Sequence, residues 1–267
     1  MTAIAGSEEN LVCGINAVTE LLRVNRARIQ QLYCQEQAGR RVRELAERAR
    51  REKITVKTVP AAALERLARG IRHQGVAAVV ASFVYTPLPE LLKRLEKRDT
   101  PVLVALDGIT DARNLGAIIR TAAAAGVAGL LLPERRSAAV NAAATKTAAG
   151  ALENLPVSRV VNLADALARL KEAGFWICGA ATAGGENLYE VDWPERLVLV
   201  LGSEDKGLRP IIARACDFSV TIPLAEASES LNVGVAAAVT LFEINRSRRH
   251  TRNASVSRSA PSRGKGI

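Results

Sequence analysis

Hydrophobic and polar positions in the first 83 residues switch repeatedly between a helical period and an extended period. The sequence therefore predicts a compact α/β domain over residues 1–83, with Gly70 closing its third helix. The predicted elements are helices at 15–24, 41–51 and 62–70 and strands at 28–34, 54–59 and 75–83.

Residues 84–101 form a different kind of segment, with three prolines and a short charged amphipathic stretch. Proline interrupts regular structure, and this composition is typical of a connection between domains. We therefore expect a linker over 84–101 that contains one helical segment.

From residue 102 the pattern changes to short, almost wholly apolar runs separated by helical segments. Such runs indicate strands of a parallel sheet that is covered on both faces. The predicted fold class of residues 102–245 is therefore α/β with a parallel sheet. The predicted strands are 102–106, 129–133, 175–180, 197–201 and 218–223, and the predicted helices are 114–126, 137–150, 162–174 and 231–244.

Residues 246–267 contain seven basic residues, no acidic residue and no apolar period. We expect a disordered basic tail, because such a segment cannot bury enough apolar surface to fold. The tail could contact phosphates or simply be solvated.

Net charge indicates a polyanionic partner, since 37 Lys and Arg stand against 27 Asp and Glu, for a net charge of +10. With 14 basic and 8 acidic residues, 1–85 carries +6, whereas 86–245 carries −3 from 16 and 19. The charge that could attract a nucleic acid or an acidic membrane is thus concentrated at the two ends. Aromatic residues make up only 3% of the chain, which argues against an extended base-stacking platform.

Cysteine and histidine usage gives no reason to expect a metal site. Cys13, Cys34, Cys178 and Cys216 are widely spaced, so we expect buried, reduced thiols. His73 and His250 are the only histidines, and a structural or RNA-contacting role is expected for His73. No apolar run is long enough to span a membrane, and the opening residues lack a signal-peptide pattern, so we expect a cytoplasmic protein.

Three loops that follow apolar runs carry candidate chemistry, because ligands of parallel sheets bind beyond the carboxyl ends of strands. Segment 107–122 holds Asn114, a candidate helix cap, and Arg120. Segment 202–208 holds Glu204, and segment 224–237 holds Ser230 as a second candidate cap, with Asn232 in the following turn. Each loop on its own also has an ordinary structural explanation. Arg120 in the first loop could be a solvated surface arginine, the second loop could be a plain turn, and the third could serve only to cap a helix.

The combination of the three loops is more specific. LDGITDARNLGAIIRTA, LVLGSEDKGL and IPLAEASESLNVGVAAAVTLFE, in this order, resemble the signature motifs of the SpoU (TrmH) family of RNA ribose 2′-O-methyltransferases. The stretches CGINAVTELL, IRHQGV and ERRSAAVNAAATKTAAGALENLPV resemble the subgroup that methylates a guanosine of bacterial 23S rRNA. The resemblance covers roughly residues 10–245.

The resemblance implies a catalytic domain with a deep trefoil knot that binds S-adenosylmethionine. It places the family's polar signature residues on Asn114, Arg120, Glu204, Ser230 and Asn232. It also implies a cofactor pocket built largely from main chain, at Gly202, Ile222 and Leu231. Members of this family act as homodimers with the active site near the subunit interface, and the first domain resembles small ribosomal-protein-like RNA-binding domains.

The sequence departs from the family pattern at three positions. Glu226 replaces a usual glycine in the third loop, and Gly234 replaces a common serine. Ala112 stands where proline is frequent, which we expect only to loosen a turn. The bulk and charge of Glu226 are expected to affect the choice of substrate.

A guanidinium is effectively never deprotonated, so Arg120 is expected to anchor a phosphate and to stabilise developing alkoxide charge. Glu204 could orient Arg120 or accept the proton, while Asn114, Ser230 and Asn232 fix orientation. Two alternatives stay open, namely a tRNA-directed or adenosine-directed methyltransferase of the same family and a non-catalytic RNA-binding or ribosome-assembly factor.

Overall fold

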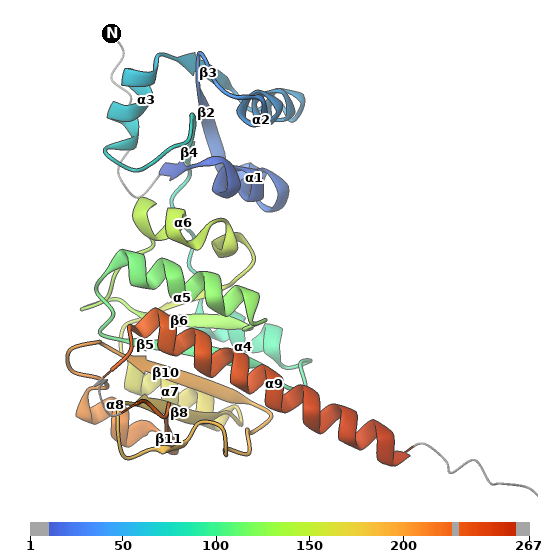
Figure 1. Ribbon diagram of the computed structural model, residues 1–267, viewed down its shortest axis with the longest axis vertical. Helices are drawn as coiled ribbons and strands as arrows, with labels where there is room; N and C mark the ends of the chain where they lie inside the picture. Colours follow the sequence, from blue (N-terminus) through green and yellow to red (C-terminus); the bar gives the residue numbers. More distant parts are fainter. Residues whose placement is uncertain (1–10, 226–229, 260–267) are drawn as a thin grey trace, which may run out of the picture.

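The computed structural model describes residues 11–225 and 230–259 and shows two α/β units, each with its own sheet (Figure 1). The N-terminal unit lies at one end of the molecule, directly above helix α6 of the C-terminal unit. Glu226 lies outside the described residues.

The N-terminal unit is a four-stranded sheet in the order β1-β4-β2-β3. Strand β4 pairs antiparallel with β1 and β2, whereas β2 and β3 are parallel. The three predicted helices and three predicted strands are all present, and β1 is an additional strand. The elements are β1 (Leu11–Cys13), α1 (Ile15–Val24), η2 (Arg26–Arg28), β2 (Ile29–Gln35), α2 (Arg40–Arg51), β3 (Val56–Val59), α3 (Ala61–Ala68) and β4 (Val76–Val80).

Helices cover both faces of the small sheet. Leu21 of α1 and Leu45 of α2 are buried on one face with Leu32, and Leu64 of α3 is buried on the other. His73 has a structural role at this second face. Its Nε2 lies 2.8 Å from Glu65 Oε2 of α3 and its Nδ1 accepts from the Gly75 amide, so it holds the turn before β4 against that helix.

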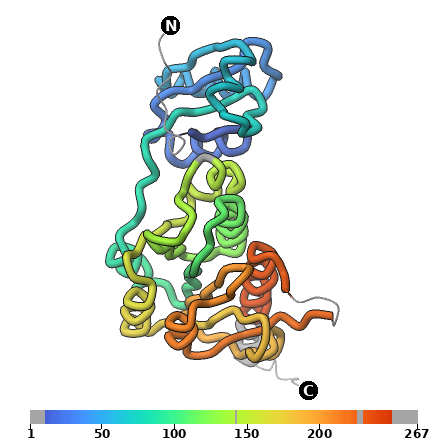
Figure 2. The backbone as a smooth tube through the Cα atoms, turned by 90° about the vertical axis from the view of Figure 1, so that its left-hand side faces the viewer, coloured from blue at the N-terminus to red at the C-terminus, as the bar shows by residue number. Residues whose placement is uncertain are grey.

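Residues 84–101 contain one helix, α4 (Leu88–Leu95), and run down one side of the molecule (Figure 2). The segment is packed rather than free. Leu88, Leu91 and Leu95 are buried against the second sheet, and the Thr86 amide donates to the Val157 carbonyl at 2.8 Å. The connection therefore belongs structurally to the C-terminal unit.

The C-terminal unit is a seven-stranded sheet in the order β7-β6-β5-β10-β8-β11-β9. Every pairing in it is parallel, so the predicted parallel sheet is confirmed. The sequence pattern missed β7 and β9, because VSRV and the two-residue β9 are too short and too polar to form apolar runs. The strands are β5 (Val102–Asp107), β6 (Gly129–Pro133), β7 (Val157–Val160), β8 (Trp176–Ala181), β9 (Glu186–Asn187), β10 (Leu197–Gly202) and β11 (Phe218–Thr221).

Alternate residues of these strands point to two separate cores. Val104 and Leu199 pack with α5, α6 and α9, whereas Leu103 and Val198 pack with α4, α7 and α8. Both faces of the sheet are thus covered, which explains the nearly continuous apolar runs. The further elements are α5 (Ala112–Ala124), α6 (Ala142–Ala148), η3 (Ala151–Glu153), α7 (Leu163–Glu172), α8 (Pro210–Ala215) and α9 (Val233–Ser259).

A largely buried ion pair joins the two units. Arg28 Nη1 lies 2.7 Å from Glu153 Oε1, and these side chains are 13% and 3% exposed. Burial raises the pKa of Glu153 even though the Arg28 guanidinium opposes the shift. Beside this pair, Asn154 Nδ2 donates to Glu20 Oε1 at 2.9 Å. Helix α1 and turn η2 therefore rest on the segment around η3.

The prediction of a disordered tail from residue 246 is wrong as far as Ser259, because α9 continues through it. Arg246 pairs with Glu243 at 2.7 Å. Arg248 donates to the carbonyls of Thr100 and Glu195 at 3.0 and 2.9 Å. A helix that is already packed extends at little cost, because each added residue gains a hydrogen bond. Residues 260–267 lie outside the described part of the chain.

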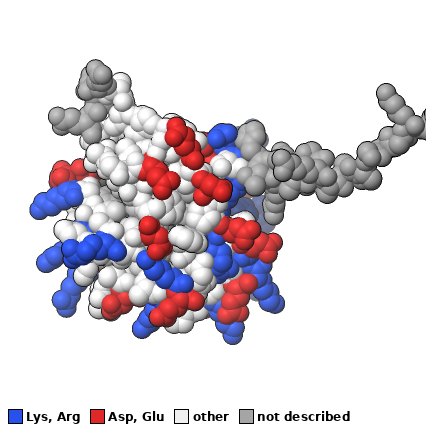
Figure 3. All heavy atoms as spheres, turned by 90° about the horizontal axis from the view of Figure 1, so that it is seen from below, with Lys and Arg blue, Asp and Glu red and all other residues white. Residues whose placement is uncertain are grey.

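Within the described residues, no helix combines the length and the apolar character needed to cross a bilayer. Lys and Arg alternate with Asp and Glu over the face of the molecule that is seen from below (Figure 3). The basic excess of the chain is therefore not gathered on that face.

Candidate active site

The three loops singled out from the sequence meet at the carboxyl edge of the large sheet. Gly202 at the end of β10 pairs with Asp107 at the end of β5, so the loops after these neighbouring strands start side by side. The third loop follows β11 and leads into α9, which packs against α5. The strand order brings the first loop together with two loops that lie 90 and 118 residues later in the chain.

Asn114, Glu204 and Asn232 form a closed cluster of hydrogen bonds, which we call the amide–carboxylate cluster. Asn114 Nδ2 donates to Glu204 Oε1 at 3.2 Å, and Asn232 Nδ2 donates to Asn114 Oδ1 at 3.1 Å. Asn232 Nδ2 also donates to Glu204 Oε1. The Val233 amide supplies a third donor to the same carboxylate oxygen at 3.2 Å. Each side chain is therefore oriented by the other two.

The two helix caps differ from those expected. Asp111 caps α5, since its carboxylate accepts from the Arg113 amide at 2.7 Å, and Asn114 lies inside that helix. Asn232, not Ser230, caps α9, because its Oδ1 accepts from the Gly234 amide at 3.0 Å. Both predicted caps were wrong by a few residues, as several polar residues near each helix start could serve equally. The shift leaves the Asn114 amide free to join the cluster.

Gly234 fits tightly at the start of α9. A Cβ atom there would lie 3.1 Å from Asn232 Oδ1 and 3.3 Å from the Ala117 Cβ. A serine at this position would therefore press on the cap and on α5, whereas glycine lets the two helices approach. Ala112 is the first residue of α5 and directly follows Asp111, which caps this helix.

A cavity of about 390 Å³ opens beside the cluster. The predicted cofactor residues Gly202, Ile222 and Leu231 all line it, as do Glu204 and Ser230. Close approach of backbone shapes its wall at Gly202, where a Cβ would lie 2.2 Å from the Gly207 carbonyl carbon. Only glycine fits at this position, because that neighbour is main chain and cannot turn aside.

Arg120 is the one polar signature residue that the structure places apart from both the cluster and the cavity lining. Its side chain is exposed and makes no hydrogen bond or ion pair to the described residues. It lies six positions after Asn114 on α5, which corresponds to about 9 Å along the helix axis. The guanidinium is therefore available to a group outside this chain.

Sequence reasoning missed a second buried polar contact at the same edge. The Asp107 side chain is fully buried and accepts from Arg209 twice, at 2.6 Å from Nε and at 2.8 Å from the backbone amide. An aspartate that ends an otherwise apolar strand was the available signal, because such a carboxylate needs a partner. The ion pair fixes the loop that carries Glu204.

The four cysteines are free thiols, and one of them lines the cavity. Cys13, Cys34 and Cys178 are buried and free, as expected, while Cys216 is only partly buried and lines the cavity. Burial raises the pKa of Cys216 to about 11, so this thiol is protonated at neutral pH. Among the residues that the structure describes, no group of His, Cys, Asp and Glu side chains could hold a metal ion.

Comparison with protein families gives two matches. Residues 101–242 match the SpoU rRNA Methylase family, and residues 11–86 match the RNA 2′-O ribose methyltransferase substrate binding family. Each match corresponds to one of the two sheets. The fold and the site together define an RNA ribose methyltransferase that uses S-adenosylmethionine.

The chain belongs to the SpoU rRNA methylase family. The 23S rRNA (guanosine-2′-O-)-methyltransferase RlmB of Pseudomonas aeruginosa is 43% identical over 248 residues, or 91% of this chain and 98% of that protein. The tRNA/rRNA methyltransferase slr0955 of Synechocystis, named as uncharacterized, is 48% identical over 186 residues, which cover 69% of this chain and 48% of that protein.

A solved structure, the AdoMet-bound rRNA methyltransferase of Sinorhizobium meliloti, superposes with a TM-score of 0.74 at 27% identity. The superposition covers 90% of this chain and 87% of that chain. The likeness therefore extends over both units.

Proposed function

We propose that this protein transfers a methyl group from S-adenosylmethionine to the ribose 2′-hydroxyl of a guanosine in 23S rRNA. One observation carries the proposal, namely the amide–carboxylate cluster that stands at the side of the 390 Å³ cavity. The RlmB protein of Pseudomonas aeruginosa, named for this reaction, aligns with nearly the whole chain.

The cavity suits S-adenosylmethionine in size and chemistry. Its volume lies within the roughly 300–1,000 Å³ typical of ligand sites. The Thr240 hydroxyl in its wall is buried and has no hydrogen-bond partner among the described residues, so a bound ligand could satisfy it. Gly202, Ile222 and Leu231 would hold the cofactor, and the nearby Glu204 carboxylate favours a cationic ligand. When bound, the cofactor supplies a methyl group already activated by its sulfonium charge.

The cluster residues position the ribose and manage one proton. Glu204 Oε1 accepts from Asn114, Asn232 and the Val233 amide, and these three donors fix the orientation of the side chain. Glu204 Oε2 has no hydrogen bond to the described residues and is free to accept the proton of the 2′-hydroxyl. Asn114 and Asn232 hold that carboxylate in place, and Ser230 at the cavity wall orients the ribose.

Arg120 anchors a phosphate next to the reacting ribose and stabilises alkoxide charge as it develops. Its exposure and lack of partners among the described residues support this role. A guanidinium stays protonated, so Arg120 acts through its charge and its hydrogen bonds and not as a base.

We also propose that two copies of the chain associate with their active sites near the interface. Val235, Ala238 and Phe242 repeat at helical spacing on α9, and Val235 and Phe242 are 48% and 52% exposed. An exposed apolar stripe of this kind favours a protein contact. Helix α9 packs on α5, which carries Arg120, so a partner on this stripe would lie close to the guanidinium.

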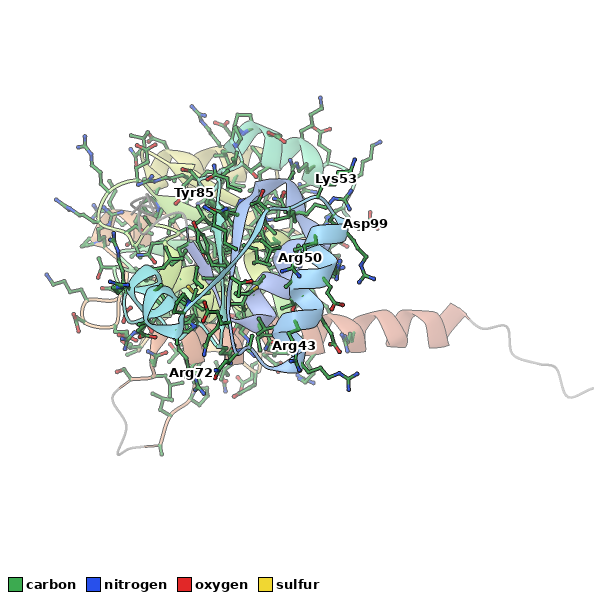
Figure 4. The ribbon with its side chains drawn as sticks, turned by 90° about the horizontal axis from the view of Figure 1, so that it is seen from above. Arg43, Arg50, Lys53, Arg72, Tyr85 and Asp99 are labelled. Carbon is green, nitrogen blue, oxygen red and sulfur yellow. The ribbon has the colours of Figure 1, made fainter. Side chains whose placement is uncertain are left out.

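The N-terminal unit supplies RNA recognition in this proposal, in the manner of a ribosomal-protein-like domain. Arg43 and Arg50 of α2 and the nearby Lys53 lie at the far end of the molecule (Figure 4). Arg43 and Arg50 also line a groove with Thr58 of β3, and Glu36 and Glu47 lie in the same wall. Free basic side chains beside a groove suit a phosphate backbone. An enzyme of this kind would act in the cytoplasm, where ribosomal RNA is available.

The domain limits and the knot belong to the same proposal. The two family matches, at 11–86 and 101–242, support a substrate domain at 1–83, a connection at 84–101 and a catalytic domain at 102–245. Strand β10 is inserted between β5 and β8, and α9 returns to α5 after β11. This order suits a trefoil knot, and the chain crossings in an experimental density map would test it.

The decisive experiment incubates the purified protein with labelled S-adenosylmethionine in two separate reactions. One reaction contains unmodified 23S rRNA and the other contains total tRNA. We expect methyl incorporation into 23S rRNA, mapped to the 2′-oxygen of one guanosine. Incorporation into tRNA or at an adenosine would redirect the proposal to another substrate. Tight RNA binding without incorporation would indicate a ribosome-assembly factor.

A further inference from the structure

A second cavity lies at the carboxyl edge of the large sheet, on the face covered by α7 and α8. Its volume is about 190 Å³, and its wall includes Arg135 and Arg136 from the loop after β6, Asn162 and Leu163 at the start of α7, and Arg209. We call it the arginine cavity. It shares no lining residue with the cavity assigned to the cofactor.

The arginine cavity concentrates positive charge in a segment that is acidic as a whole. Three arginines line it and no acidic residue does, although residues 86–245 carry a net charge of −3. One of the three, Arg209, is paired with the buried Asp107, so the other two supply the unpaired charge. Glu134 and Asp165, the nearest acids along the chain to Arg135 and Asn162, are not part of the wall. The cavity is therefore positively charged, whereas the segment that contains it is negatively charged overall.

The guanidinium groups of the arginine cavity retain free donors. Arg135 and Arg136 are exposed and make no hydrogen bond or ion pair to the described residues. Arg209 is held to buried Asp107 through Nε and its backbone amide, which leaves both terminal nitrogens without a described partner. Buried Asp107 thus fixes the direction of Arg209 and does not consume its terminal donors.

The start of α7 adds to the positive potential. This ten-residue helix is capped by Asn162, whose Oδ1 accepts from the Ala164 amide at 3.0 Å. The first backbone amides of a helix are positively polarised and favour anions. Three arginines and a helix N-terminus therefore surround one small space.

We propose that the arginine cavity binds a phosphate of the RNA backbone, outside the nucleotide that is methylated. A volume of 190 Å³ is below the roughly 300 Å³ of sites for whole small molecules, so the cavity suits a single group of a larger ligand. Arginine forks match the oxygens of a phosphate. The inference rests on the proposed RNA substrate.

The loop after β10 limits how far this phosphate lies from the reacting ribose. Glu204 and Arg209 are five residues apart, so their Cα atoms are separated by no more than about 18 Å. Along one strand of duplex DNA each nucleotide advances about 3.4 Å, which we take as the order of the spacing in a stacked RNA strand. The contacted phosphate therefore lies within roughly five stacked nucleotides of the methylated position. The lengths of the side chains add to this limit, because it is measured between Cα atoms.

The test compares the salt dependence of 23S rRNA binding by the full-length wild type and by the double variant Arg135→Gln/Arg136→Gln. Losing one phosphate contact should lower the slope of log Kobs against log salt by about 0.7–0.9. Arg209 is left intact, since its removal would strand the buried Asp107 carboxylate.

Arg169→Gln is the matched control, because Arg169 is an exposed arginine near the other end of α7 and should leave the slope unchanged. An unchanged slope in the double variant would overturn the proposal, even if the wild type methylates the RNA. A lowered slope without any methylation by the wild type would support the phosphate site and refute the enzymatic function.

A second measurement separates an RNA phosphate from a free anion. Inorganic phosphate, compared with chloride at equal ionic strength, is added while the melting temperature is followed. One outcome is that phosphate raises the melting temperature of the wild type but not that of the double variant, while the salt slope of RNA binding is the same for both proteins. That result would make the cavity a site for a small free anion and overturn the RNA assignment.

Discussion

The amide–carboxylate cluster and the arginine cavity lie at the same edge of one parallel sheet, yet they use hydrogen bonds in opposite ways. Asn114, Glu204 and Asn232 bond mainly to one another. Arg135 and Arg136 bond to no described residue. A group that must hold one orientation is locked by its neighbours, whereas a group that must receive a ligand keeps its donors free.

The loop after β10 serves both sites. Glu204 near its start joins the cluster, and Arg209 at its end reaches the arginine cavity. The Asp107 carboxylate, buried between strand and loop, holds that end in place. Chemistry and RNA contact are thus placed by one short segment, and variants can test whether the two roles are truly separate.

The largest effect is expected from Glu204→Gln. The amide oxygen can still accept from Asn114 and Asn232, so the cluster should stay folded while the charge and the proton acceptor are lost. We expect the single-turnover rate to fall by about 100-fold or more. Asp205→Asn is the control, because Asp205 is an exposed carboxylate in the same turn and lies outside the cavity wall. Equal rates for both variants would remove Glu204 from the reaction.

Arg120→Ala tests the one signature side chain that resembles the arginine cavity in having no described partner. We expect single-turnover methylation of bound RNA to fall by roughly 100-fold, equivalent to about 2.7 kcal/mol, as for loss of one donor to a developing oxyanion. Arg113→Ala, another exposed arginine of α5, should have little effect. A nearly normal rate in Arg120→Ala would show that the anchoring role is wrong.

A smaller effect is expected from Asn232→Ala on stability. Losing the cap of α9 should lower the free energy of unfolding by about 1 kcal/mol, measured by urea denaturation. The rate should fall as well, because Asn114 and Glu204 lose a shared donor. Asn141→Ala removes the cap of α6 and should cost similar stability at an unchanged rate. If both variants behave alike, Asn232 is only a cap.

The local spacing of apolar residues predicted most of the helices and strands. The remaining features of the fold depend on pairing between strands that are distant in the sequence. The helix at 15–24 and the strand at 129–133 coincide with α1 and β6, because apolar spacing and turn residues mark both ends. Strand β7 was missed, since Ser158 and Arg159 interrupt its apolar character. The position of β10 between β5 and β8 depends on pairings that no local pattern contains.

The site likewise has parts that the local sequence marks and parts that form only in the folded chain. The three loops were singled out because they follow predicted strands, and family resemblance then made their polar residues specific. The structure brings Asn114, Glu204 and Asn232 together. The arginine cavity was not foreseen, because Arg209 lies more than 70 residues after Arg135 and Arg136 and they meet only in the folded chain. The helical tail was missed because Arg248 docks through backbone carbonyls, which leave no mark in the sequence.

Helix α9 has one property that reaches beyond its packing. It starts at the Asn232 cap on the carboxyl edge of the sheet, and about 22 Å further along, Arg248 binds the Thr100 and Glu195 carbonyls that precede β5 and β10. A six-residue strand such as β10 spans nearly the same length, about 20 Å. The helix therefore matches the width of the sheet and is fastened at both margins. Ending the chain before Arg248 would remove the distant anchor of the helix that Asn232 caps, while leaving every side chain of the amide–carboxylate cluster in place.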